Sequence, residues 1–184
     1  MSNGVLCFAN NNGKINYILQ AQELAKRVRK YLDLPTSIVT STPCQVDKSC
    51  FDKVIHSEHP MGNFKRYYDG ASTHVNIPFN NAGRISSYDI SPYDQTLVLD
   101  TDVIICNSDL KNAFDSVHDF QIYKDCIDLT NWRIHKEFNY INDKGIPFYW
   151  ATVFCFRKTK QTKIFFELMK HIKQEWTHYS NVFE

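Results

Sequence analysis

Apolar runs that alternate with polar segments predict an α/β fold for this chain. β-branched and aromatic residues gather in six short runs that are expected to be strands: residues 4–9, 36–40, 51–56, 96–99, 120–123 and 148–156. Helical spacing of apolar residues predicts helices at 17–32 and 162–178, and a short helix is expected at 109–114. A strand, a helix and a second strand at this spacing predict a right-handed parallel unit.

Each long helix is expected to bury one stripe of side chains. In the first helix the stripe is Ile18, Ala21, Leu24, Ala25, Val28 and Leu32, with polar residues such as Gln20 and Arg27 on the opposite side. In the last helix the expected stripe is Ile164, Phe165, Leu168, Met169, Ile172 and Trp176. Residues 57–90 are polar and punctuated by Gly and Pro, and are expected to be an irregular connection, either a functional loop or an interrupted helix.

The most continuous apolar run ends in two carboxylates. Residues 96–99 read Thr-Leu-Val-Leu and are followed by Asp100, Thr101 and Asp102. Such a run is typical of a strand buried on both faces, and acids at its end are costly unless a cation meets them. On an extended backbone both acids leave the same face, and a turn at Thr101 would also let them converge. In open α/β sheets this edge is where ligands bind.

Two neighbouring carboxylates supply the oxygen ligands that Mg²⁺ or Mn²⁺ prefers, with phosphate oxygens and water completing the shell. Asp100 and Asp102 are therefore the candidate metal ligands. A bare Asp-x-Asp pair can also cap the next helix or simply lie in water. The position of this pair, at the end of the best buried strand, favours the metal site.

Composition narrows the class of protein. A chain of 184 residues can bury a core and is expected to form one domain, residues 1–184. Lys and Arg total 21 against 20 Asp and Glu, so the net charge of +1 gives no general basic field for nucleic acid. Six cysteines, several of them in apolar runs and none in a Cys-x-x-Cys motif, predict reduced core residues and a cytoplasmic location. We expect no secretory signal and no membrane segment, because no long apolar run occurs.

The first expected strand leads into a polar turn at residues 10–14, Asn-Asn-Asn-Gly-Lys. The turn lacks the Gly-x-Gly-x-x-Gly pattern of dinucleotide-binding folds and the Gly-Lys-Ser/Thr of phosphate loops. It would still let a base and ribose approach the backbone. Tyr17 offers a ring for stacking, although a core aromatic at the helix start is the alternative. Arg84 is a candidate for neutralising phosphate charge.

The opening strand and helix, together with residues 91–102, resemble the glycosyltransferases of the GT-A fold. Residues 91–102 read Ser-Pro-Tyr-Asp-Gln-Thr-Leu-Val-Leu-Asp-Thr-Asp. They are similar to a Pro-Tyr/Phe-Asp-x-Thr-x-x-Leu-Asp-x-Asp run in family-8, glycogenin-like nucleotide-sugar transferases, and look closest to transferase-like proteins carried by phages. The resemblance extends over residues 4–176, but only 84–105 are specific. It implies a single Rossmann-like domain with a mostly parallel, twisted sheet flanked by helices.

The resemblance implies a hexosyl- or pentosyltransferase that moves a sugar from a nucleoside-diphosphate sugar. Mn²⁺ or Mg²⁺ would be held by Asp100 and Asp102 against the donor diphosphate. The donor-binding residues it implies are Ala9, Asn10, Tyr17, Arg84, Asp100, Thr101, Asp102 and Trp150. It assigns no catalytic acid or base, and the acceptor (a glycan, a protein or a modified nucleic-acid base) stays open. The host cytoplasm is the expected location for a phage-encoded member.

The chain departs from the family pattern at two places. Trp-Ala-Thr stands at residues 150–152 where the family often has Asn-x-Gly, which leaves the donor sugar open. Family-8-like enzymes also supply a His metal ligand and basic phosphate contacts from a later segment, and nothing after the last helix matches it. We expect that water replaces this ligand or that the chain is truncated at the C-terminus.

Two rival hypotheses remain. One is a truncated or inactive GT-A-like domain with a binding or structural role. The other is a nucleotidyltransferase that makes sugar nucleotides, which would share the fold but require a Gly-rich, basic first loop. Residues 10–14 contain a single Gly, which argues against the second rival.

Overall fold

A central sheet of six strands, in the order β3-β2-β1-β6-β8-β7, organises the protein. The computed structural model describes residues 1–58, 63–67, 74–78, 80–124, 149–175 and 178–179. The strands of the sheet are β1 (Asn3–Phe8), β2 (Thr36–Thr40), β3 (Lys53–His56), β6 (Gln95–Leu99), β7 (Phe120–Lys124) and β8 (Tyr149–Arg157). Neighbours among β3, β2, β1 and β6 are parallel, whereas β8 is antiparallel to β6 and to β7. The predicted α/β fold with a mostly parallel sheet is confirmed.

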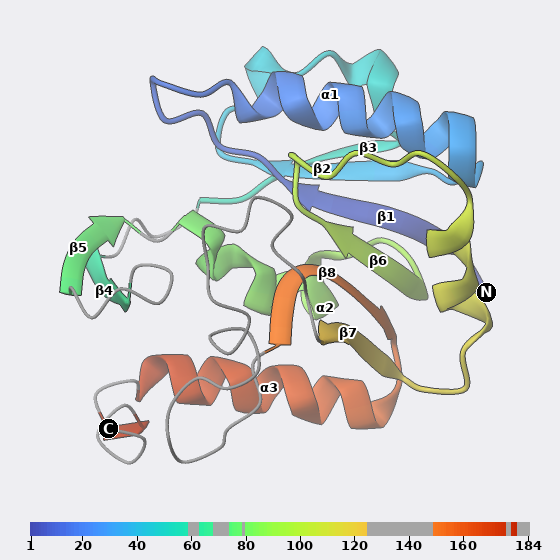
Figure 1. Cartoon of the computed structure of the whole chain (residues 1–184). Helices are drawn as coiled ribbons and strands as arrows, with labels where there is room; N and C mark the ends of the chain where they lie inside the picture. The colour runs from blue at the N-terminus through green and yellow to red at the C-terminus, as the bar shows by residue number, and fades with distance from the viewer. Residues whose placement is uncertain (59–62, 68–73, 79, 125–148, 176–177, 180–184) are drawn as a thin grey trace.

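Helices cover both faces of this sheet (Figure 1). One face carries α1 (Tyr17–Arg27), which continues into a π-helical turn, η1 (Val28–Leu32). The opposite face carries α3 (Lys160–Gln174) and the short α2 (Ser87–Ile90). The chain also forms four 3₁₀ segments among the described residues: η2 (Pro43–Gln45), η3 (Lys48–Cys50), η4 (Asn80–Ser86) and η5 (Asp109–Asp115). No described helix combines the length and the apolar character needed to cross a membrane.

Alternation along the central strands builds a core on each side of the sheet. Val5 and Cys7 of β1 join the α1-side core, whereas Leu6 joins the α3-side core. Neighbouring β6 repeats this pattern, with Leu97 on the α1 side and Val98 on the α3 side. Both strands are therefore buried on two faces, which the continuous apolar run of residues 96–99 predicts for β6.

The first helix agrees with its predicted stripe. Its six apolar positions are each 2% exposed or less: Ile18, Ala21, Leu24, Ala25, Val28 and Leu32. The side chain of Asn16 accepts a hydrogen bond from Leu19 N and caps the start of α1. After η1, Asp33 takes a left-handed conformation with φ of 52°, which ends the helical segment and turns the chain toward β2.

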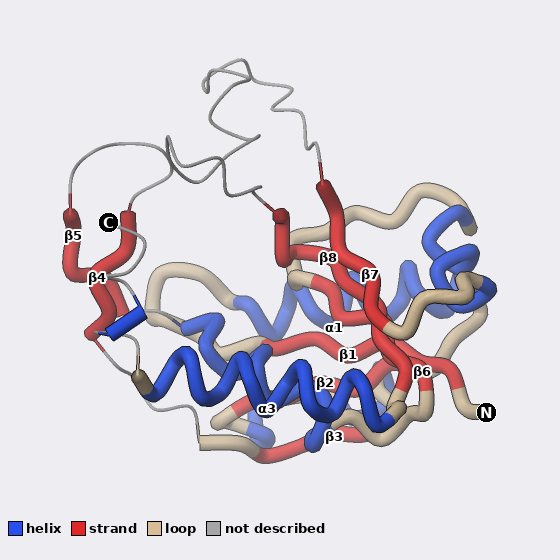
Figure 2. The backbone as a smooth tube through the Cα atoms, turned by 90° about the horizontal axis from the view of Figure 1, so that it is seen from below, coloured by secondary structure: helices blue, strands red, loops and turns tan. Residues whose placement is uncertain are grey.

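Residues 57–90 were expected to be irregular, and this expectation is wrong. β4 (Asn63–Tyr67) pairs antiparallel with β5 (His74–Pro78) in a separate two-stranded sheet. Figure 2 shows this hairpin to one side of the six-stranded sheet. η4 and α2 then lead the chain back to β6. Gly and Pro residues mark the turns between short elements as well as irregular chain, so punctuation alone could not separate the two.

The predicted stripe of the last helix is also wrong in part. Phe166 is the buried apolar side chain of α3, at 1% exposed, whereas Ile164, Phe165 and Leu168 are 56%, 38% and 49% exposed. Phe166 inserts between aromatic rings on the sheet, and its ring centroid lies 4.9 Å from that of Phe156. Met169 packs against the same core. Trp176, the last predicted position, lies outside the described residues.

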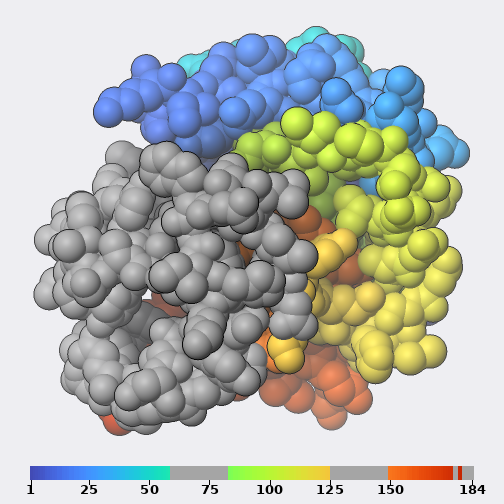
Figure 3. All heavy atoms as spheres, in the orientation of Figure 1, coloured from blue at the N-terminus to red at the C-terminus, as the bar shows by residue number. Residues whose placement is uncertain are grey.

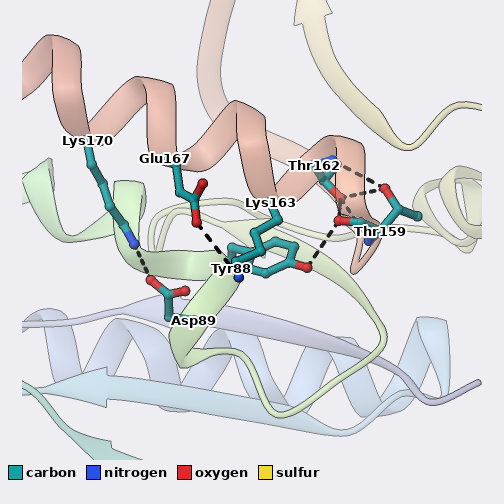
Figure 4. Close-up of polar contacts among 7 residues, drawn as sticks. All are labelled: Tyr88, Asp89, Thr159, Thr162, Lys163, Glu167 and Lys170. Carbon is teal, nitrogen blue, oxygen red and sulfur yellow. Dashed lines mark hydrogen bonds and ion pairs between the residues drawn. The ribbon is translucent and has the colours of Figure 1, made fainter.

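Polar contacts at the start of α3 fix its rotation (Figure 4). Thr159 and Thr162 form a capping box in which each side chain meets the other residue's backbone N–H. Thr159 Oγ1 also donates to Asp119 Oδ2 at 2.8 Å. Tyr88 of α2 donates to Thr159 O at 3.1 Å. Because these contacts tie the start of α3 to α2 and to Asp119, the residue before β7, they decide which stripe of α3 faces the core.

Replacing Thr159 by alanine should therefore lower stability by about 1–2 kcal/mol, since the helix loses its N-cap. For a protein of this size that corresponds to a melting temperature lower by about 3–6 °C in circular dichroism. Thr159→Ser keeps the capping oxygen and serves as the control. Equal melting temperatures for Thr159→Ala and wild type would show that the cap does not hold α3.

Candidate functional site

The two predicted carboxylates lie on a tight turn at the carboxyl end of β6, which we call the acidic turn (residues 100–103). Val103 N donates to Asp100 O at 3.2 Å and closes the turn, while Asp100 N donates to Thr152 O of β8 at 3.0 Å. Only 15% of the Asp100 side chain is exposed, whereas Asp102 is open to solvent. One acid is thus embedded in the protein and the other is available to a ligand.

Arg84 of η4 meets the embedded acid. Its guanidinium forms an ion pair with Asp100 Oδ1 through Nη2, and its Nη1 donates to Ala151 O of β8 at 3.1 Å. Asp100 Oδ1 is shielded from solvent and accepts no hydrogen bond of normal geometry from the described residues. Since a buried carboxylate is costly without a counter-charge, Arg84 supplies the compensation that the sequence predicts for this strand end.

Thr101, between the two acids, contacts helix α1 on one side of the sheet. Its side chain is buried, at 8% exposed, and its hydroxyl donates to Gln20 Oε1 of α1 at 3.2 Å. Further along the same segment, Arg27 Nη1 donates to Ile105 O at 3.1 Å. Gln20 and Arg27 were expected on the solvent side of the helix, but both are half-buried and contact the segment that follows β6. Figure 3 shows the blue N-terminal layer lying on this yellow-green segment.

The asparagine-rich turn after β1 is shaped by its own side chains. Asn10 Oδ1 accepts hydrogen bonds from Ser41 N at 2.7 Å and Ser41 Oγ at 3.0 Å, which joins the ends of β1 and β2. Asn11 Oδ1 accepts from Ile18 N at 3.1 Å and ties the turn to α1. Gly13 has φ of +79°, a conformation that favours glycine. The turn is therefore a defined structure anchored to two neighbouring elements.

Sheet register places the predicted residues at one edge. Cys7 of β1 lies opposite Leu99 of β6, and Leu99 lies opposite Val153 of β8. The residues after β1, the acidic turn and the first residues of β8 therefore meet where the parallel strands end. Trp150 is half-buried near the start of β8. This is the edge at which open α/β sheets bind ligands.

Three residues that were predicted to contact the donor are partly or wholly buried and contact other parts of the protein. Ala9 is buried, at 1% exposed, and its N–H donates to Val39 O at 3.0 Å. Tyr17 is half-buried and packs against the α1-side core. Asn10 is half-buried and bound to Ser41, as described above. Two contacts of the acidic turn were missed: that of Thr101 with Gln20 and that of Asp100 N with Thr152 O. A polar residue on a helix and a backbone carbonyl on a strand carry no sequence signal for such contacts.

The oxygen ligands offered by Asp100 and Asp102 fit a divalent cation that is held jointly by protein, substrate and water. Asp100 and Asp102 offer hard oxygen ligands of the kind that Mg²⁺ and Mn²⁺ bind. Asp100 Oδ1 is shielded from solvent and is already paired with the Arg84 guanidinium, so its charge is compensated without a metal. Within the described part of the chain, no three His, Cys, Asp or Glu side chains gather around one point. The protein's own share of such a site is therefore these two carboxylates.

Cysteines are poor candidates for chemistry at this edge. The five described cysteines are free, and Cys7 and Cys155 are buried. Burial raises the pKa of Cys7 to about 12 and that of Cys155 to about 11, so neither is a thiolate at neutral pH. Cys44 and Cys106 are exposed rather than in the core as expected, and Cys126 lies outside the described residues.

Comparison of the sequence with protein-family models and with curated proteins finds no match. Solved structures define the class of fold: the chain has a GT-A-like, Rossmann-type architecture. Two similar structures are of LgtC. One, an active-site mutant, matches with a TM-score of 0.59 at 17% identity, over 94% of this chain and 64% of that one. The other, galactosyltransferase LgtC in complex with donor and acceptor sugar analogues, has a TM-score of 0.57 at 18% identity, over 93% and 64%. The chain thus spans 64% of the length of these structures.

Proposed function

We propose that this chain is a glycosyltransferase domain that binds a nucleoside-diphosphate sugar with Mn²⁺ or Mg²⁺ at the acidic turn. The observation that carries the proposal is the position of Asp100 and Asp102. They follow the central buried strand of a GT-A-like sheet, at its ligand-binding edge, with Arg84 beside them. The similar LgtC structure is of a galactosyltransferase with donor and acceptor sugar analogues, which supports the same class of substrate here.

Each residue has a role in this proposal. Asp100 and Asp102 would hold the cation, which when bound neutralises charge on the donor diphosphate and on the leaving group. Arg84 orients Asp100 and adds positive charge on the same side. Because Ala9 and Asn10 use their side chains internally, the backbone of the asparagine-rich turn is the part offered to base and ribose.

Tyr17 and Trp150 would border the donor, since both residues are half-buried at the site edge. The acceptor in this proposal is a glycan, a protein or a modified nucleic-acid base. A family-8, glycogenin-like member encoded by a phage and working in the host cytoplasm is the finer form of the proposal. It rests on the sequence resemblance of residues 91–102.

A second candidate function follows from the Arg84–Asp100 pair. Arg84 already compensates the embedded carboxylate, so the same turn could be stable without any metal. In that case the domain would bind a ligand, or serve structure, without metal-dependent transfer. The two candidates differ in whether a divalent cation strengthens nucleotide binding.

A thermal-shift screen separates them. Wild type and Asp102→Asn are each melted with UDP, GDP, CDP or TDP, with and without Mn²⁺. A nucleotide at about 100 times its dissociation constant should stabilise the wild type by about 2.7 kcal/mol, or roughly 5–10 °C. We expect such a shift for one nucleotide, dependent on Mn²⁺ and lost in Asp102→Asn.

Asp109→Asn is the matched control, because Asp109 is an exposed acid on η5 outside the acidic turn. It should keep the full shift. Shifts that are unchanged by Mn²⁺ and by Asp102→Asn would favour the metal-independent domain. A melting temperature that no nucleotide changes would contradict donor binding altogether.

A further inference from the structure

The hydroxyl of Thr101 connects the acidic turn to helix α1. Thr101 stands between the two carboxylates, and its side chain is 8% exposed. Its Oγ1 donates to Gln20 Oε1 at 3.2 Å. A β-branched side chain has few χ1 rotamers, so one hydrogen bond to a fixed partner defines the orientation of the residue. The two acids are attached to the peptide units on either side of this residue.

Gln20 is a fixed partner because α1 is anchored at its start. Asn16 caps Leu19 N at 2.9 Å, and Asn11 Oδ1 accepts from Ile18 N at 3.1 Å. The adjoining residues Ile18 and Ala21 are buried against the sheet. Gln20 therefore cannot shift without moving the helix or breaking the bond.

The acidic turn is thus held from three sides. β8 holds its first residue through Asp100 N and Thr152 O, at 3.0 Å, and Arg84 holds the Asp100 carboxylate. Both of these contacts act on Asp100. The contact between Gln20 and Thr101 acts beyond Asp100, on the part of the turn that leads to the exposed Asp102.

We propose that Gln20 is a positioning residue for the candidate metal site, acting through Thr101 to set the direction of Asp102 relative to Asp100. The inference rests on the proposed function, because it concerns binding of a divalent cation by these two acids. Groups that orient metal ligands affect affinity without touching the metal. The alternative is that Thr101 is merely a buried hydroxyl with a satisfied hydrogen bond, which would affect stability alone.

Mn²⁺ alone is the probe, because its free form gives an electron paramagnetic resonance signal that disappears on binding. Wild type, Asp102→Asn, Gln20→Met, Thr101→Val and Thr101→Ser are titrated without nucleotide. Gln20→Met and Thr101→Val keep the size of the side chain but lose the bond, and should weaken Mn²⁺ binding by about 3–10-fold. Thr101→Ser keeps the hydroxyl and should bind within about 2-fold of wild type. The Gln20→Met/Thr101→Val double variant should bind Mn²⁺ no more weakly than either single variant, since both substitutions remove the same hydrogen bond.

Gln22→Met is the matched control, because Gln22 lies about 200° around the same helix from Gln20. It should bind Mn²⁺ as wild type does. Hydrogen exchange of the Val103 amide in the metal-free protein gives a second readout, and should be faster in Gln20→Met and Thr101→Val but not in Gln22→Met.

The outcomes distinguish the two proposals. If wild type binds Mn²⁺, Asp102→Asn does not, and Gln20→Met and Thr101→Val match wild type, the positioning role is wrong while the metal site stands. A lower melting temperature with unchanged Mn²⁺ affinity leads to the same conclusion. If wild type binds no Mn²⁺ in the absence of nucleotide, the positioning role is overturned, whereas the metal site itself is judged by the Mn²⁺-dependent nucleotide shift described above.

Discussion

Replacing Arg84 by methionine should destabilise the fold by about 3 kcal/mol, because the change leaves Asp100 embedded without a counter-charge. Both side chains of the pair are largely buried, at 16% and 15% exposed. Methionine fills a similar volume without charge, and the hydrogen bond to Ala151 O is also lost. Urea denaturation followed by circular dichroism would measure the loss as a lower midpoint with an unchanged slope.

A double-mutant cycle gives this prediction its control. Asp100→Asn removes the buried charge, so the Arg84→Met/Asp100→Asn variant should recover more than half of the stability that Arg84→Met loses. Arg84→Lys keeps the charge without the planar fork and should lie between wild type and Arg84→Met. If Arg84→Met and wild type unfold at the same urea concentration, the ion pair is not what compensates Asp100.

Replacing Gly4 by alanine should destabilise the protein by about 3 kcal/mol, at the upper end of the range for overpacking. A Cβ at Gly4 would lie 2.4–2.5 Å from three atoms of the Tyr93 ring. That ring cannot move away freely. Tyr93 is 5% exposed, and its hydroxyl shares a 2.7 Å hydrogen bond with Ser37 Oγ. Thermal denaturation should show a melting temperature lower by roughly 6–12 °C.

Gly13→Ala is the contrasting control, because no atom lies within 4 Å of a Cβ at Gly13. Its cost comes only from the left-handed φ and should be about 1 kcal/mol. Replacing Tyr93 by leucine as well should make Gly4→Ala less costly than it is in wild type, since the ring that it would meet is gone. Equal costs of Gly4→Ala in both backgrounds would contradict a clash with Tyr93.

Tyr93 also explains part of the sequence block that resembles GT-A enzymes. Burial raises the pKa of Tyr93 to about 12, so its hydroxyl stays protonated and bonded to Ser37 on β2. Ser91 and Thr96 share a 2.5 Å hydrogen bond between their hydroxyls next to it. The Ser-Pro-Tyr-Asp segment therefore anchors the start of β6, at the opposite end of the strand from the acidic turn.

The sequence by itself determined the central part of the fold. Apolar runs identify β1 as a strand and β6 as a strand buried on both faces, and the stripe from Ile18 to Leu32 identifies the helix beside them. These patterns are local, because side-chain burial follows the period of each element. The same patterns place Asp100 and Asp102 at the end of a buried strand, near a ligand-binding edge of the sheet.

Only the tertiary structure decided which partner each element meets. The antiparallel insertion of β8 between β6 and β7 depends on pairing between residues such as Leu99 and Val153, far apart in sequence. The stripe that α3 buries depends on the capping box at Thr159 and on the pocket of rings around Phe166. The spacing of apolar residues along α3 does not contain this information, since the helix carries apolar residues on its exposed side as well as on its buried side.

The same distinction holds at the candidate site. The sequence indicated two acids that need a cation and a basic residue, Arg84, ahead of them, but it could not show that Arg84 pairs with Asp100 directly. It also placed Gln20 on the solvent side of its helix, where the amphipathic pattern puts polar residues. The structure turns Gln20 toward Thr101 because packing of α1 on the sheet brings its first turns against the end of β6. Composition and period define which residues are polar, whereas packing of distant elements defines what those polar residues bind.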